Sequence, residues 1–105
     1  MIKGKKIWLN GNLVDWDDAK VHIVSETFSY GIGIFEGIRC YRTERGRAVF
    51  RLREHMKRFI NSGKVLFLKI PYSVEELMTA THEAVKANDL DECYVRTHGL
   101  YRQLW

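Results

Sequence analysis

The stretch YGIGIFEGIRCY, residues 30–41, decides the fold of this chain. Gly31 and Gly33 end a single helical turn that Ser25 can cap. The segment from Ile34 to Tyr41 is predicted to form a long β-strand, in which successive side chains point to opposite faces. One face presents Phe35, Gly37, Arg39 and Tyr41, and the other presents Ile34, Glu36, Ile38 and Cys40.

Hairpins flank this strand on both sides. Asn10-Gly11 is a two-residue turn that joins the predicted strands 6–10 and 13–16. Further extended segments are predicted at 20–23, 47–50 and 92–97. We therefore expect an α+β domain: a mostly antiparallel sheet of about six strands with two helices packed on it.

Two segments have helical periodicity. The first, 52–62, carries an apolar stripe, and Gly63 is its natural stop. The second begins at Ser73, where Glu76 completes a capping box, and ends near Asn88. Its predicted buried stripe consists of Val74, Leu77, Met78, Thr81 and Val85.

Composition limits the class of protein. The 105 residues allow one domain, and no apolar run is long enough for a membrane span. The N-terminus lacks the apolar core of a signal peptide, so we expect a cytoplasmic protein. Cys40 and Cys93 are expected to be buried free thiols rather than a disulfide or a zinc site. The net charge is +4, but the lysines and arginines are spread along the chain and mixed with 13 acidic residues. We therefore expect no nucleic-acid partner and no membrane partner.

Polar groups on the strand faces are the candidates for chemistry. Arg39 shares a face with Phe35 and Gly37, and Tyr94 shares one with Arg96. A guanidinium fork beside a phenol suits a small carboxylate, although a surface cation next to a half-buried tyrosine would give the same pattern. On the first helix, one inward arginine could hold a phosphate; the alternative is a solvated basic face.

The same residues carry a family resemblance. Residues 30–41 resemble the Y-G-x-x-x-F-E-G-I-R-x-Y signature of branched-chain aminotransferases, which are fold-type IV enzymes that use pyridoxal 5′-phosphate (PLP). The segments 7–11, 19–22, 50–58, 75–77 and 94–96 match further landmarks of that family in order and spacing, so the resemblance covers 5–96.

The resemblance implies a role for each candidate. Arg58 corresponds to the arginine that binds the PLP phosphate. The substrate pocket would include Tyr30, Phe35, Gly37 and Arg39, and the substrate carboxylates would be held by Tyr94 and Arg96. We expect the two strands and the basic helix to converge into one wall that holds anions.

The implied reaction is amino transfer between leucine, isoleucine or valine and 2-oxoglutarate, with glutamate as the other amino acid. The family's catalytic lysine lies in a larger C-terminal domain, beyond position 105, so we assign no catalytic residue and no metal ligand here and expect this chain alone to be inactive. Two alternatives stay open. One is another fold-type IV enzyme, such as a D-amino-acid aminotransferase or aminodeoxychorismate lyase. The other is a stand-alone binding or interaction domain.

The end of the sequence departs from the family. We expect 1–96 to form the small domain and 97–105 to be an atypical tail, because the family continues with proline and an apolar, glycine-containing stretch. One hypothesis is that the tail is translated out of frame; the other is an engineered boundary. With the larger domain absent, the surface around Phe35 and Arg96 would be uncovered, so we expect a homo-oligomer.

Overall fold

The computed structural model describes residues 3–101. The chain begins with the strands β1 (Lys6–Leu9) and β2 (Asn12–Asp15), the 3-10 helix η1 (Trp16–Asp18) and the short helix α1 (Glu26–Tyr30). The remaining elements are β3 (Gly33–Thr43), β4 (Gly46–Val49), α2 (Leu52–Val65), α3 (Val74–Asn88) and β5 (Cys93–Leu100). The α+β class is confirmed.

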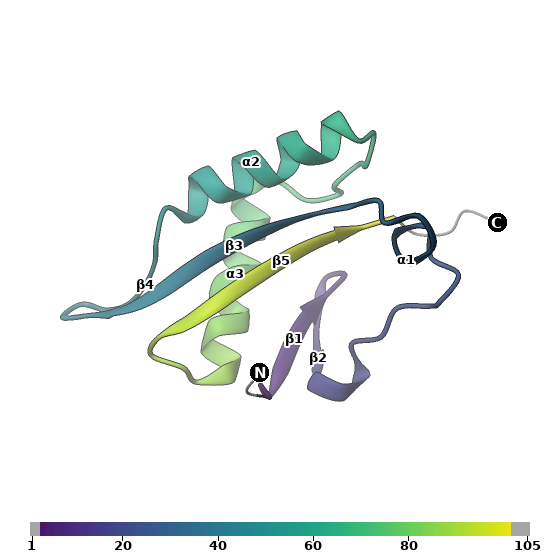
Figure 1. Ribbon diagram of the computed structural model, residues 1–105. Coiled ribbons are helices and arrows are strands. Elements are labelled where there is room, and N and C mark those ends of the chain that lie inside the picture. Colours follow the sequence, from purple (N-terminus) through teal and green to yellow (C-terminus); the bar gives the residue numbers. More distant parts are fainter. Residues whose placement is uncertain (1–2, 102–105) are drawn as a thin grey trace.

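The strands form two antiparallel sheets, one of β1 and β2 and one in the order β4-β3-β5 (Figure 1). In the larger sheet β3 pairs with β5 from Gly33↔Leu100 to Cys40↔Cys93. On its other edge β3 pairs with β4 only from Cys40 to Thr43. The edge of β3 over residues 33–38 therefore has no partner strand within the described part of the chain.

The part of the chain that the structure describes has five strands where about six were expected, because Lys20–Ile23 forms no strand. The Ser25 amide donates to the carbonyl of His22 at 3.0 Å, and the Val24 amide donates to Nδ1 of the same histidine at 3.1 Å. These local bonds bend the segment into a turn, which leads directly into α1. The short apolar alternation in this segment was too weak to specify pairing.

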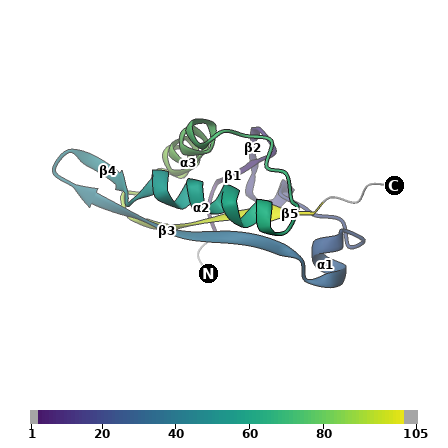
Figure 2. The same cartoon turned by 90° about the horizontal axis from the view of Figure 1, so that it is seen from above.

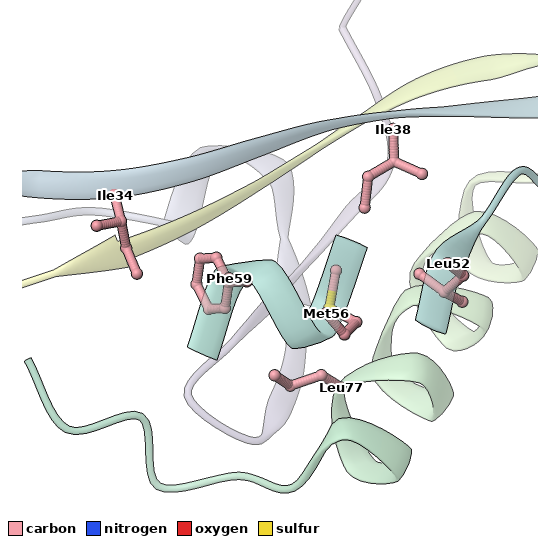
Figure 3. Packing of buried hydrophobic residues seen from close by; sticks show 6 residues of the cluster. All are labelled: Ile34, Ile38, Leu52, Met56, Phe59 and Leu77. Carbon is pink, nitrogen blue, oxygen red and sulfur yellow. The ribbon is translucent and has the colours of Figure 1, made fainter. Parts of the chain in front are cut away.

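Helices α2 and α3 lie on the same side of β3 and β5 (Figure 2). Ile34 and Ile38 of β3 meet the buried face of α2, and Leu77 of α3 closes the cluster (Figure 3). Ile38 and Met56 are fully buried. The predicted stripe of α2 is thus confirmed at its centre, and the core fills the space between one face of the sheet and the helices; its six buried members are Ile34, Ile38, Leu52, Met56, Phe59 and Leu77.

Gly63 does not end α2, contrary to expectation; the helix continues to Val65. The chain beyond it turns back, so that the Leu68 amide donates to the Gly63 carbonyl at 2.8 Å. A Cβ at Gly63 would lie 2.7 Å from the carbonyl oxygen of Leu68. Glycine is therefore needed here because the following loop packs against the helix, and the left-handed backbone of Phe67 (φ 56°) makes that return possible.

Helix α3 begins as predicted, with a complete capping box between Ser73 and Glu76. Its last residue, Asn88, joins the helix to the N-terminal hairpin. The Asn88 side chain accepts from the amides of Lys5 at 2.6 Å and Lys6 at 3.0 Å, and donates to the Lys6 carbonyl at 2.9 Å. The smaller sheet is thus fixed to α3 by hydrogen bonds between the Asn88 side chain and the hairpin backbone, and Trp8 also contacts Tyr72 in the loop before α3.

The final strand is longer than predicted, since β5 continues through Thr97 to Leu100. The first part of the expected atypical tail is therefore regular sheet, while 102–105 lie outside the described residues. Cys40 and Cys93 are free thiols; Cys40 is buried and Cys93 is partly buried. Within residues 3–101, no helix has the length and apolar character needed to cross a membrane.

Candidate active site

The face of the larger sheet that points away from α2 and α3 gathers most of the predicted site residues. On β3 the exposed positions alternate with buried ones, and on β5 the same alternation places Tyr94, Arg96 and His98 outward. The register pairs Gly37 with Arg96 and Arg39 with Tyr94. The two strand faces predicted from the sequence are therefore confirmed, and we call this surface the open face: Phe35, Gly37, Arg39, Tyr94, Arg96 and His98.

Arg96 is the centre of the open face. Its guanidinium carbon lies 5.4 Å from the ring centroid of Phe35 and 5.4 Å from that of Tyr94. Both are cation–π distances, so the two rings attract and orient the charge. Arg96 Nη2 donates to Tyr94 Oη at 3.5 Å, near the outer limit for a hydrogen bond. Within residues 3–101, most of the hydrogen-bonding capacity of Arg96 is thus available to an anion.

Gly37 allows the tyrosine to lie across the strand. A Cβ at Gly37 would stand 2.2 Å from Tyr94 Oη and 3.0 Å from Cζ, far inside normal contact. The missing side chain lets the phenol approach the β3 backbone beside Arg96. Phe35 and Tyr94 remain 63% and 50% exposed, so the cluster forms a shallow wall rather than an enclosed pocket.

Two predicted residues lie at the margin of this group. Arg39 is exposed on the open face, beside Tyr94 in the register. Tyr30 is the last residue of α1 and is 74% exposed, where the left-handed Gly31 (φ 68°) turns the chain toward β3. Within residues 3–101, the hydrogen bond and cation–π contacts of Arg96 involve neither of them.

Arg58 approaches β3 from the other side. It lies on α2, and its Nε and Nη2 donate to the two carboxylate oxygens of Glu36 at 2.8 and 2.7 Å. Glu36 points to the helix-facing side of the strand, opposite the direction of Arg96. The two guanidinium groups therefore reach β3 from its two faces, rather than forming one continuous wall as expected.

Glu36 has a second partner besides Arg58, the histidine His55, which was not predicted from the sequence. His55 Nδ1 lies 2.7 Å from Glu36 Oε1. The Glu36 side chain is only 3% exposed, and Arg58 holds the pKa of its carboxyl below the usual value, assisted by His55 and opposed by burial. The carboxylate in turn raises the pKa of Arg58. A signal existed in the sequence: an acidic residue between Ile34 and Ile38 on an apolar face requires charged partners.

His98 was also missed. It faces Phe35 across the β3–β5 register on the open face. Partial desolvation lowers its pKa, and the charge of Arg96 lowers it further. The imidazole is therefore neutral near pH 7 and adds a polar but uncharged group beside the arginine.

Comparison with known proteins identifies the class. Residues 33–99 match the family model of amino-transferase class IV, so the chain belongs to that family. Within it, the chain corresponds to the smaller, N-terminal domain of branched-chain aminotransferases, as its relatives show. The branched-chain-amino-acid aminotransferase of Escherichia coli K12 is 45% identical over 94 residues, which are 90% of this chain and 30% of that protein. That of Pseudomonas aeruginosa is 43% identical over 95 residues, covering 90% and 31%.

Solved structures agree. The crystal structure of the E. coli branched-chain amino acid aminotransferase superposes with a TM-score of 0.89 at 44% identity, covering 91% of this chain and 32% of that one. The branched-chain aminotransferase of the archaeon Thermoproteus uzoniensis, solved with norvaline, gives a TM-score of 0.86 at 45% identity, covering 90% and 32%. The chain therefore spans about a third of the length of the proteins it matches. The family resemblance inferred from the sequence is confirmed.

Proposed function

We propose that this chain supplies the small-domain side of the active site of a PLP-dependent branched-chain aminotransferase. The observation that carries the proposal is the placement of Arg96 between Phe35 and Tyr94 on the open face, where its N–H groups are largely unbonded among the residues that the structure describes. Arg96 and Tyr94 would bind a substrate carboxylate. The ring of Phe35 would contact an apolar side chain, which suits leucine, isoleucine and valine beside the carboxylates of glutamate and 2-oxoglutarate.

Arg58 would bind the phosphate of PLP. Its side chain is 68% exposed, and Nη1 has no hydrogen bond within the described residues, so one edge of the fork is available to an anion. The Arg58 guanidinium could supply some of the donors of a phosphate site, and the resemblance implies that most other donors come from the larger domain. PLP, when bound, supplies an electron-withdrawing ring that acidifies the substrate Cα–H. The lysine that moves this proton in the family lies in the larger domain, so we assign no such role to this chain.

The unpaired edge of β3, residues 33–38, lies between the sides occupied by Arg58 and Arg96. A cofactor placed at this edge would have the phosphate near the helix side and the substrate near the open face. Tyr30 and Arg39, exposed just before and after this edge, would complete the substrate pocket. In this arrangement, guanidinium groups on the two faces of the sheet would bind the same ligand.

A chimera tests the proposal. Residues 1–96 joined to the larger domain of the 45% identical E. coli enzyme should bind PLP and transfer the amino group of leucine to 2-oxoglutarate. Arg96→Ala should lower kcat/KM by roughly 100-fold, because a charge-assisted contact to the carboxylate is lost. The matched control is Arg42→Ala, since Arg42 is an exposed arginine of the same sheet that pairs loosely with Asp91 at 3.8 Å. A chimera that binds PLP but is insensitive to Arg96→Ala would refute the assignment.

We further propose that the 105-residue chain self-associates through the open face. Phe35 and Tyr94 expose aromatic surface next to an unpaired strand edge, and both features favour association between copies. Sedimentation velocity should show a weight-average mass that rises with concentration. Replacing Phe35 by Ser should reduce this rise, and a strictly monomeric wild-type chain at high concentration would contradict the proposal.

A further inference from the structure

Glu36 occupies a position that the packing of the core does not explain. It lies between Ile34 and Ile38 on the face of β3 that α2 covers, and it is 4% exposed. An unpaired carboxylate there would be strongly unfavourable. Both of its oxygens are instead bonded: Oε2 accepts from Arg58 Nε, and Oε1 accepts from Arg58 Nη2 and contacts His55 Nδ1 at 2.7 Å.

We propose that Glu36 is a positioning residue, which fixes the guanidinium plane of Arg58 so that Nη1 is presented to the phosphate of the bound cofactor. This inference rests on the proposed function of Arg58 and adds the residue that orients it. Glu36 itself would not touch the cofactor.

The geometry supports positioning because the bond is a fork. Two parallel N–H···O bonds define a plane, whereas a single bond leaves the arginine free to rotate about it. Arg58 is 68% exposed and would otherwise sample many rotamers. Glu36 lies in the middle of β3, and its carboxylate is also held by His55. The ordered carboxylate therefore restricts the motion of the exposed Arg58 side chain.

The carboxylate must be ionised to accept both bonds. Arg58 lowers the pKa of Glu36 more than any other group, and His55 adds to this effect, whereas burial acts in the opposite direction. The fork therefore persists at neutral pH. It can open only in acid, below the ordinary glutamate pKa.

A purely electrostatic role of Glu36 and a positioning role predict opposite changes in phosphate binding when Glu36 is neutralised. The negative charge of Glu36 offsets that of Arg58, so if Glu36 acted only as a charge, neutralising it would strengthen phosphate binding. If Glu36 positions the guanidinium, neutralising it would weaken binding, because the arginine would have to be ordered each time a ligand binds. The sign of the change therefore separates the two roles.

The experiment uses the chimera of residues 1–96 with the larger domain, which supplies the other phosphate donors, and pyridoxamine 5′-phosphate as the probe because its amine does not condense with lysines. Binding is followed through the Nε–Hε resonance of Arg58 in ¹H–¹⁵N spectra, with inorganic phosphate as a second probe. Glu36→Asp keeps the charge but shortens the side chain, and Glu36→Gln keeps the length but removes the charge. Both should weaken binding by roughly 3- to 10-fold, which corresponds to the immobilisation of one long side chain. Glu75→Gln is the matched control. Glu75 of α3 pairs at 2.9 Å with Arg53, which lies on α2 like Arg58 but away from the fork, so this substitution should leave binding unchanged.

A measurement on the wild-type chain makes the test independent of mutant folding. Without ligand, the Nε–Hε group of Arg58 should have an order parameter close to that of rigid backbone; a value below about 0.6 would overturn the proposal. Unchanged binding in Glu36→Asp, or tighter binding in Glu36→Gln, would also overturn it while leaving the role of Arg58 intact. Failure of the wild-type chimera to bind either probe would instead refute the proposed function.

Discussion

Adding one methyl group at Gly99 or at Gly37 tests the two faces of the sheet separately. Both glycines lie in the β3–β5 ladder, so each Gly→Ala change gains about 0.5–1 kcal/mol from the lower backbone entropy of the unfolded chain. The surroundings differ. At Gly99 the new Cβ would lie 2.7 Å from Ile34 Cγ1 and 3.1 Å from Phe59 Cζ, both in the core.

Overpacking of this kind costs about 1–3 kcal/mol, because buried side chains have no free volume to move into. Subtracting the entropy gain leaves a net loss of about 0–2.5 kcal/mol for Gly99→Ala, and at the middle of this range the melting temperature of a domain of this size should fall by roughly 5–10 °C. At Gly37 the clash is with the outer end of Tyr94, which is half exposed and can rotate away. The displacement of Tyr94 offsets part of the backbone gain, so Gly37→Ala should change the free energy of unfolding by less than about 0.5 kcal/mol.

The assay is urea unfolding followed by tryptophan fluorescence and far-UV circular dichroism, together with a thermal melt. Ligand binding should reverse the order of the two variants. Gly37→Ala displaces Tyr94 and with it the hydrogen bond to Arg96, so it should weaken binding of a carboxylate such as 4-methylvaleric acid, whereas Gly99→Ala should not. If Gly37→Ala destabilised the chain as much as Gly99→Ala, the assignment of an open and a covered face would be refuted.

Three further changes test other parts of the structure. Ser73→Ala removes the cap of α3 and should lower the free energy of unfolding by about 1 kcal/mol, measured by thermal denaturation; no change would show that the capping box is not formed in solution. Asn88→Ala breaks the bonds to the hairpin and should cost about 1–3 kcal/mol, with faster hydrogen exchange at the amides of Lys5 and Lys6. Unchanged exchange at those two amides would contradict the contact. The lowered pKa of Glu36 contributes stability above the ordinary pKa of 4.5, and this contribution is lost as the pH falls through the folded-state value. Wild-type stability should therefore fall more steeply than that of Glu36→Gln as the pH drops below 4.5. If urea denaturation gave the same dependence of stability on pH for both proteins, an ionised Glu36 in the native state would be excluded.

Local patterns in the sequence predicted local structure well. Ser73 and Glu76 form their capping box because both partners lie within one helical turn. Asn10 and Gly11 both adopt positive φ, as a two-residue hairpin turn requires. The alternation along β3 assigned its faces correctly, because side chains in a strand strictly alternate.

Long-range packing explains what the sequence did not predict. Gly63 resembles a helix stop, but its role depends on Leu68, which only the return of the loop brings close. The separation of Arg58 from the open face follows from the side of the sheet on which α2 packs, and periodicity alone does not determine that side. Glu36 could have been found from its apolar neighbours, but the choice of its partner required the structure.

The pairing of β3 with β5 has a consequence for how this domain is made in the cell. The hairpin is tied to Asn88 across 83 residues, and the longest strand finds its main partner only in the last of the described elements to be synthesised. Because distant contacts must be closed before they stabilise anything, folding should be slow for a protein of this length. Until β5 leaves the ribosome, the edge of β3 that pairs with it is exposed, and such an unpaired strand edge favours aggregation of the nascent chain.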